Sequence, residues 1–416
     1  MKNVFLIIIT LKIILSQIIF PFKIKTNENI NDPEEYIKIY QNNNITIELN
    51  LGTPNQKLPI YLKLQKYPFS ISSSKTNLPI ETFKENESNS LEIISKEENF
   101  EDEDFKIGKK VKDIFLINNN NLKLNFILSS KQGYLLQDTG IIGLSFKSNN
   151  KDLKEYNFIE QLKEKKIIQK EIFFLEYKND IEGNFILGKF PHEINKKYDK
   201  KNYKEFEPNI INTRIEIKLN DINYGKYEIE SLIDCTLSYE NSLLRGTSKY
   251  KEIVLKNFFN EYIKNNHCFN TSIGLLGSYI YYCDDSIDIT KFQPLIFTFY
   301  QSNFTFELDY NDLFIKKGKY YFFLCYFYKT ISTNYLLGKP FFKKYTFLFN
   351  KEKRNIGFYY KDNSNFFNFF PWFILILALG IIVYLSYYIY KIVKIKKKKK
   401  QASELIEEIL NESEKE

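Results

Sequence analysis

Leu51-Gly52-Thr53-Pro54-Asn55-Gln56 is the stretch on which the interpretation of the whole chain depends. It separates two short runs, residues 45–49 and 58–64, in which β-branched and other apolar side chains alternate with polar ones or follow one another. Such runs, interrupted by glycine and proline, predict strands. Residues 214–219 have the same pattern. Few segments have the spacing of a helix. They are residues 157–166 and residues 250–264, and Asn157 is the expected N-cap of the first.

Residues 51–56, taken with segments further along the chain, resemble motifs of the pepsin-family aspartic proteases. The segments that follow resemble the family's Gly-Ile-Leu-Gly-Leu segment, its next helix and connection, the strand that closes its first lobe, its late Leu-Gly motif and its closing strands. They are residues 140–144, 158–169, 183–188, 335–342, 346–350 and 356–358. The resemblance covers residues 45–361 and implies a mainly β, bilobal fold, with two β-rich lobes flanking a cleft.

Length and composition divide the chain into parts that agree with this resemblance. About 340 residues between the two apolar ends are too many for one small core, so two lobes are expected. A stretch crowded with Lys, Asn, Tyr and Glu and bounded by prolines is expected to join them. The predicted parts are a signal peptide (1–20), an N-terminal lobe (22–190), an interlobe linker (191–209), a C-terminal lobe (210–361), a transmembrane helix (369–390) and a cytosolic tail (391–416).

Both ends of the chain carry apolar runs that indicate membrane targeting. Residues 4–20, preceded by Lys2, are typical of a secretory signal peptide with a weak cleavage site at Leu15-Ser16-Gln17, and an uncleaved anchor is the alternative. Residues 369–390 contain no charge and are long enough to cross a bilayer. Trp372 lies near one end of this run and three tyrosines near the other, where amphipathic rings prefer the interface.

Lysines follow the second apolar run directly. There are seven, namely Lys391, Lys394 and Lys396 to Lys400, and they place the C-terminus in the cytosol beside anionic lipids. They nearly account for the net charge of +8, so the excess positive charge belongs to the predicted membrane anchor. No basic and aromatic pattern elsewhere resembles a nucleic-acid site. We predict a single-pass type I membrane protein of the secretory pathway, at the cell surface or in an endomembrane, with no nucleic-acid partner.

The catalytic residues of the family are two aspartates, one from each lobe, which share a proton and act as base and acid. Counting forward from Gly52-Thr53-Pro54 without a gap, the first of these aspartates falls on Lys63. Leu64 and Gln65 then replace the hydroxyl residue that reaches across to the other lobe and the glycine of the turn. The first lobe therefore lacks its catalytic carboxylate.

The second aspartate is assigned to Asp234, because residues 232–234 resemble the approach to it. Cys235 and Thr236 follow, so this turn has also lost its glycine. We expect Asp234 to remain as a remnant of the catalytic pair and to face Lys63 across the cleft. Asp138-Thr139-Gly140 also spells the catalytic tripeptide, but it lies some 86 residues after Gly52 and directly before the 140–144 motif, so we do not assign it to catalysis. The flap region, about residues 88–112, contains no tyrosine.

These replacements lead to two hypotheses. The first is a catalytically inactive protein that binds a peptide or protein ligand in the interlobe cleft, or acts as a surface scaffold. The second is an active, membrane-anchored aspartic endopeptidase that uses Asp234 with an unexpected second group. We expect no cofactor and no metal, because His192 and His267 have no cysteine or carboxylate at metal-ligand spacing. With no histidine placed to activate it, Cys235 is interpreted as a small buried residue.

Cysteines and glycosylation sequons fit a secreted domain. Four cysteines allow up to two bridges in three connectivities. The resemblance implies the bridge Cys283–Cys325 and leaves Cys235 and Cys268 unpaired. Lumenal glycosylation sequons begin at Asn44, Asn86, Asn270 and Asn303.

Overall fold

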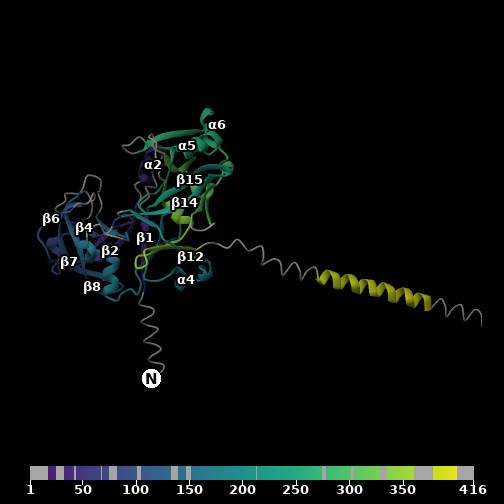
Figure 1. Ribbon diagram of the computed structural model, residues 1–416, viewed down its shortest axis with the longest axis horizontal. Coiled ribbons are helices and arrows are strands. Elements are labelled where there is room, and N and C mark those ends of the chain that lie inside the picture. Colours follow the sequence, from purple (N-terminus) through teal and green to yellow (C-terminus); the bar gives the residue numbers. More distant parts are fainter. Residues whose placement is uncertain are drawn as a thin grey trace, which may run out of the picture. The chain divides into compact units, whose positions relative to one another are not determined.

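The computed structural model describes most of the chain in two units, which are residues 1–359 and residues 360–416. The described residues are 17–24, 32–41, 44–66, 68–74, 82–100, 105–132, 139–146, 151–211, 213–273, 278–300, 304–327, 335–359 and 378–400. In the first unit these residues are mainly strands, arranged in two sheets (Figure 1). The sequence-based prediction of a mainly β fold is therefore confirmed.

The larger sheet has fourteen strands, in the order β12-β25-β24-β10-β11-β1-β2-β3-β9-β4-β8-β7-β5 with β6 paired to β7. The strands are β1 (Ile18–Ile24), β2 (Ile45–Leu51), β3 (Gln56–Lys63), β4 (Phe69–Ser72), β5 (Glu92–Ile93), β6 (Glu98–Asn99), β7 (Phe105–Ile117), β8 (Asn120–Gln132), β9 (Gly140–Gly143), β10 (Ile172–Tyr177), β11 (Glu182–Leu187), β12 (Tyr203–Phe206), β24 (Phe347–Asn350) and β25 (Asn355–Tyr359). We call the part from β2 to β9 the first lobe.

The smaller sheet has eleven strands, in the order β17-β18-β22-β16-β23-β15-β14-β19-β20, with β13 on β14 and β21 on β22. The strands are β13 (Asn209–Ile211), β14 (Arg214–Tyr224), β15 (Tyr227–Leu237), β16 (Leu244–Gly246), β17 (Cys268–Ile273), β18 (Ser278–Asp284), β19 (Leu295–Phe299), β20 (Thr305–Leu308), β21 (Phe314–Lys317), β22 (Tyr320–Phe327) and β23 (Tyr335–Leu337). We call this sheet with its helices the second lobe.

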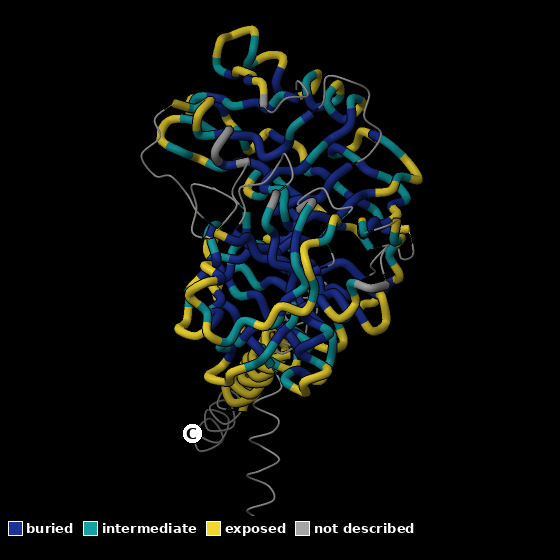
Figure 2. The backbone as a smooth tube through the Cα atoms, turned by 90° about the vertical axis from the view of Figure 1, so that its left-hand side faces the viewer, coloured by how far each residue is buried: buried dark blue, intermediate teal, exposed yellow. Residues whose placement is uncertain are grey.

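The strands form where the sequence alternates, because successive side chains of a strand point to opposite faces. Burial alternates residue by residue along β1 and nearly so along β2, and Figure 2 shows buried residues running along the strands. Aromatic rings fill much of the core. Phe69, for example, has its ring centroid 5.4 Å from that of Phe115, 5.8 Å from that of Phe126 and 5.2 Å from that of Phe158. The abundance of phenylalanine in the chain therefore has a structural role.

The predicted helices are confirmed with small changes of bounds. Helix α3 (Phe158–Glu164) begins after Asn157, whose side chain accepts a hydrogen bond from the Glu160 amide at 3.2 Å, as a capping residue does. The second predicted helix is α5 (Ser248–Val254), continued through a π-helical turn and α6 (Asn260–Lys264). Two further short helices matter below, α2 (Pro33–Gln41) and α8 (Lys339–Lys344).

Three predicted boundaries differ from the structure. Strand β1 begins at Ile18 and pairs with β11, so the larger sheet includes residues 18–20, which we assigned to the end of the signal peptide. The interlobe segment 191–209 is not a simple linker, because it contains helix α4 (Pro191–Ile194) and strand β12, which pairs with β25. Strands β24 and β25 join the larger sheet, although we assigned them to the C-terminal lobe.

The predicted bridge Cys283–Cys325 is wrong. Cys283 is bonded to Cys268, and these two residues lie directly opposite each other in the antiparallel pair β17–β18 with Cα atoms 4.0 Å apart. In the neighbouring strand β22, the residue opposite Cys283 is Tyr321, while Cys325 lies beside Leu244. Cys325 and Cys235 are buried and free, so only the expectation for Cys235 is confirmed.

The second unit contains one described helix, Ala378–Lys400, which is long and apolar enough to cross a membrane. It includes the second part of the predicted span 369–390 and continues through the seven lysines. Residues 369–377 lie outside the described residues, as do residues 1–16 of the predicted signal peptide.

Candidate functional site

The first loop of interest follows strand β3. Strands β3 and β9 run parallel, with Leu62 beside Ile142 and Lys63 beside Gly143. The amide of Leu144 donates a hydrogen bond to the carbonyl oxygen of Lys63 at 2.9 Å. Lys63 is therefore the last residue of β3, at the point where the chain leaves the sheet, and its side chain is buried.

The second lobe repeats this arrangement with strands β15 and β23. These strands also run parallel, and Leu237 lies beside Leu337. The amide of Ser238 donates a hydrogen bond to the carbonyl oxygen of Leu337 at 3.1 Å. Ser238 thus follows the last residue of β15 and stands opposite Gly338, as Lys63 stands opposite Gly143. By this register, Ser238 is the counterpart of Lys63.

Asp234 does not occupy the position that we assigned to it. It lies within β15, opposite Lys218 of β14, and its side chain is exposed. It comes four residues before Ser238, so it is not the counterpart of Lys63. The assignment of Asp234 rested on the short resemblance of residues 232–234. A better signal was the triplet Leu336-Leu337-Gly338, which repeats the Ile141-Ile142-Gly143 pattern of the first lobe.

A carboxylate joins the two loops directly. Glu240 Oε1 accepts a hydrogen bond from the backbone amide of Gln65 at 3.0 Å. Its other oxygen, Oε2, accepts a hydrogen bond from Ser238 Oγ at 2.6 Å, and Asn241 Nδ2 donates to the same Oγ at 2.7 Å. Gln65 and Glu240 each lie two residues after Lys63 and Ser238, respectively. We refer to this group of hydrogen bonds as the Glu240 bridge.

The residues between these positions are large and buried. Leu64 is fully buried, and so offers no hydroxyl group where the family has one. Its counterpart Tyr239 places its ring 4.5 Å from that of Phe342 and 5.5 Å from that of Phe349. The Tyr239 hydroxyl is buried without a hydrogen-bond partner among the described residues, and burial raises its pKa. Both side chains are therefore held by packing.

A second carboxylate, Glu216, lies on β14. It stands opposite Thr236 of β15, two residues before Ser238. Thr236 Oγ1 donates a hydrogen bond to Glu216 Oε1 at 3.4 Å. Burial, together with the nearby charge of Asp234, raises the pKa of Glu216. This carboxylate is paired with a hydroxyl group and lies on a strand, not in either loop.

The geometry has a clear chemical consequence. Acid and base catalysis by this kind of site needs two carboxylates close enough to share a proton. Lys63 and Ser238, which the two strand registers make counterparts of each other, carry an ammonium group and a hydroxyl group. Glu240, the carboxylate nearest to them along the second loop, accepts hydrogen bonds with both of its oxygens.

The other candidate residues lie apart from these loops. His192 Nδ1 is 2.6 Å from the Tyr359 hydroxyl, and His267 Nδ1 is 3.0 Å from Asp284 Oδ2. Within the described ranges, no three His, Cys, Asp or Glu residues are grouped so as to hold a metal ion. Burial raises the pKa of the Cys235 thiol. Asp138 and Asn303 lie outside the described residues.

The flap region is built on strand β7. Strands β5 and β6 each pair with β7, and Ile93 and Ile94 are exposed there. Asn86 lies just before, on the surface, as does Asn270 on β17, while Asn44 is half-buried.

Comparison with known protein families agrees with this geometry. Residues 46–360 match the model of the eukaryotic aspartyl protease family. This match covers well over half of the chain, which therefore belongs to the eukaryotic aspartyl protease family, with a pepsin-like fold and its substrate-binding cleft. No protein in a search of curated sequences matches the chain.

Proposed function

We propose that this member of the family is catalytically inactive as an aspartic protease and uses its cleft to bind a peptide or protein ligand. The observation that carries this proposal is the register of the two loops, which makes Ser238 the counterpart of Lys63. The resemblance to the family implies that Lys63 stands where a catalytic aspartate is expected. Neither side chain can exchange a proton as a carboxylate dyad does.

The Glu240 bridge supports a retained binding role. It fixes the spacing of the two loops through Gln65, which belongs to the first lobe, while Glu240 belongs to the second. A chain that had lost both catalysis and binding would have no need for a specific contact at this point. The bridge therefore supports a cleft that keeps its shape without its chemistry.

The chain is further proposed to be a type I membrane glycoprotein of the secretory pathway. The helix Ala378–Lys400 and the Cys268–Cys283 disulfide are consistent with this compartment. The exposed positions of Asn86 and Asn270 would allow glycosylation. We expect endoglycosidase treatment to lower the mass of each single variant, Asn86→Gln and Asn270→Gln. No loss of mass in the double variant would support glycosylation at these two sites.

The decisive experiment is a cleavage assay with the full-length protein. A peptide library is incubated with it between pH 3 and pH 7, with and without a statine-type inhibitor, and products are read by mass spectrometry. We expect no inhibitor-sensitive cleavage. The matched variants are Asp234→Ala and Glu240→Gln. Inhibitor-sensitive cleavage that either variant abolishes would overturn the proposal and would identify the unexpected catalytic carboxylate.

A further inference from the structure

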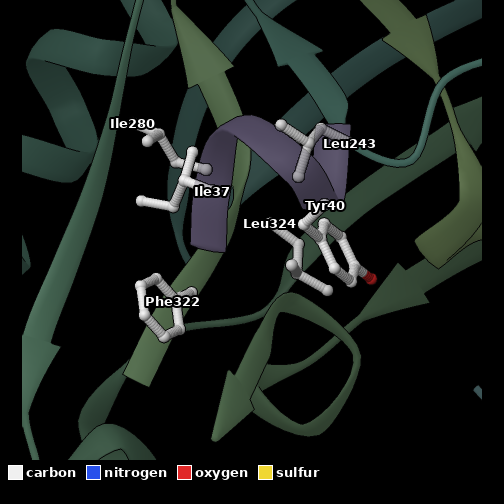
Figure 3. Packing of buried hydrophobic residues seen from close by; sticks show 6 residues of the cluster. All are labelled: Ile37, Tyr40, Leu243, Ile280, Phe322 and Leu324. Atoms are coloured by element: carbon white, nitrogen blue, oxygen red, sulfur yellow. The ribbon is translucent and has the colours of Figure 1, made fainter. Parts of the chain in front are cut away.

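A small cavity of about 50 Å³ lies between helix α2, helix α8 and the second lobe. Neither Lys63 nor Ser238 lines it. One wall is apolar and includes Tyr40, Ile315 and Leu324. Figure 3 shows the neighbouring cluster, in which Tyr40 and Ile37 of α2 lie against Leu324 and other apolar residues of the second lobe. The other wall carries charged side chains.

Lys339 is the buried cation of this charged wall. It is the first residue of α8, and only 4 % of its surface is exposed. Its Nζ atom lies 5.2 Å from the centre of the Tyr40 ring, a cation–π distance. Among the residues that the structure describes, no carboxylate lies within ion-pair distance of this Nζ atom.

The other charges of the cavity are already paired. Lys343 forms an ion pair with Asp180, and Lys344, just outside the cavity, forms one with Asp312 at 2.5 Å. The charge of Asp180 favours a protonated Lys339, while that of Lys343 opposes it. Asp180 and Asp312, the two carboxylates that line the cavity, therefore form ion pairs with other lysines. The ammonium group of Lys339 instead lies over the face of the Tyr40 ring.

A buried ammonium group without a counter-ion is unfavourable, because it has lost water and gained no charged partner. Burial accordingly lowers the pKa of Lys339 to about 8. The amine remains largely protonated near neutral pH. A negatively charged ligand in the cavity would supply the missing counter-ion, and the apolar wall would accommodate a hydrocarbon group beside it.

We propose that this cavity binds a small organic carboxylate, with its charged end paired to Lys339 and a short apolar tail against Tyr40, Ile315 and Leu324. The apolar wall is what distinguishes such a ligand from an inorganic anion. Only a short tail, such as that of butyrate, suits so small a cavity. The proposal is independent of what the interlobe cleft binds.

The probe is butyrate, and the reporter is the amine of Lys339. The full-length protein in detergent is labelled by reductive methylation, and the rate at Lys339 is followed by mass spectrometry with and without butyrate. Butyramide, which has the same shape without charge, and sodium chloride at equal ionic strength are the controls. Lys353, which is exposed on another surface, reports general effects on lysine labelling.

We expect butyrate to slow labelling of Lys339 at least tenfold at saturation and to leave Lys353 unchanged. Above pH 8 the affinity should fall about tenfold per pH unit as Lys339 loses its proton. Saturable stabilisation by butyrate in thermal unfolding should disappear in Lys339→Met and persist in Lys353→Met. Equal protection by butyramide or chloride, or no protection at all, would contradict the proposal.

Discussion

The two loops hold the same place in their lobes but differ in what they contribute. The first loop, residues 63–65, offers a buried lysine, a buried leucine and a backbone amide. The second, residues 238–241, supplies all the polar side chains of the Glu240 bridge. The family has an equivalent aspartate and hydroxyl residue in each lobe. The contrast teaches that the polar side chains of this contact between the lobes all come from one lobe.

The largest expected effect concerns Gly338, which lies opposite Ser238. A Cβ atom at this position would meet the carbonyl oxygens of Leu243 and Asn241 at 2.2 and 2.6 Å. We expect Gly338→Ala to lower the free energy of unfolding by about 3 kcal/mol or more, since backbone atoms must move. Urea unfolding of the full-length protein in detergent measures it.

Gly318 provides the control for this prediction. It has a φ of +59° but open space around the Cβ position, so Gly318→Ala should cost about 1 kcal/mol from backbone conformation alone. Similar losses in the two variants would show that the second loop tolerates displacement, and the contrast between the loops would weaken.

The disulfide is a second difference between the lobes, because all four cysteines of the chain lie in the second lobe. The bridge joins residues 15 apart in sequence, for which the chain-entropy model gives about 3 kcal/mol. Reductant should therefore lower the urea midpoint of the wild-type protein. It should have no effect on the double variant Cys268→Ser, Cys283→Ser. An unchanged wild-type midpoint would argue against this pairing.

Removal of the Glu240 bridge tests the comparison itself. Glu240→Ala removes the carboxylate that accepts hydrogen bonds from the Gln65 amide and from the Ser238 hydroxyl group. Because hydrogen bonds to charged groups are stronger than neutral ones, we expect a loss of about 2 kcal/mol in unfolding free energy. Glu228→Ala, on the exposed end of β15, should change it by less than about 0.5 kcal/mol. Equal effects would mean that the bridge does not join the lobes energetically.

The smallest effect is a dependence on pH near the first loop. Lys351 is buried, donates a hydrogen bond to the carbonyl oxygen of Ser145 and lies 3.7 Å from Glu160. Burial lowers its pKa to about 8. The unfolded chain therefore binds more protons between pH 8 and pH 10, and stability should rise with pH in that window.

The measurement compares the wild-type protein with Lys351→Met. The difference in unfolding free energy should move in favour of the wild-type protein by about 1 kcal/mol from pH 7 to pH 9. A difference that stays constant with pH would indicate that the ammonium group is not desolvated.

Local features of the fold were predictable from the sequence, and contacts between distant segments were not. Asn157 could be identified as a cap because its partner, Glu160, lies three residues on. The Glu240 bridge joins residues 175 apart, and no local pattern indicates it. The Cys268–Cys283 pair depends on the register of β17 and β18, which a one-residue shift would destroy.

The site shows the same division. Lys63 was assigned to the first loop by a short ungapped count from Gly52, and in the structure it lies beside Gly143 at the end of β3. Asp234 was misplaced because a three-residue match decided the register, while the parallel pairing of Leu237 with Leu337 lay a hundred residues away. Sequence alone therefore directed attention to Lys63 and missed its counterpart in the second lobe, Ser238.

The composition of the larger sheet has a consequence for biosynthesis. Strand β10 pairs with β24, with Ile172 beside Asn350, and β25 then pairs with β12. Until β24 and β25 are made, β10 and β12 lack these partners and expose strand edges, on which chains can aggregate. The predicted anchor begins only ten residues after β25 ends at Tyr359. Completion of this sheet during synthesis is therefore nearly simultaneous with synthesis of the anchor, and a chaperone that protects the unpaired edges would act before that moment.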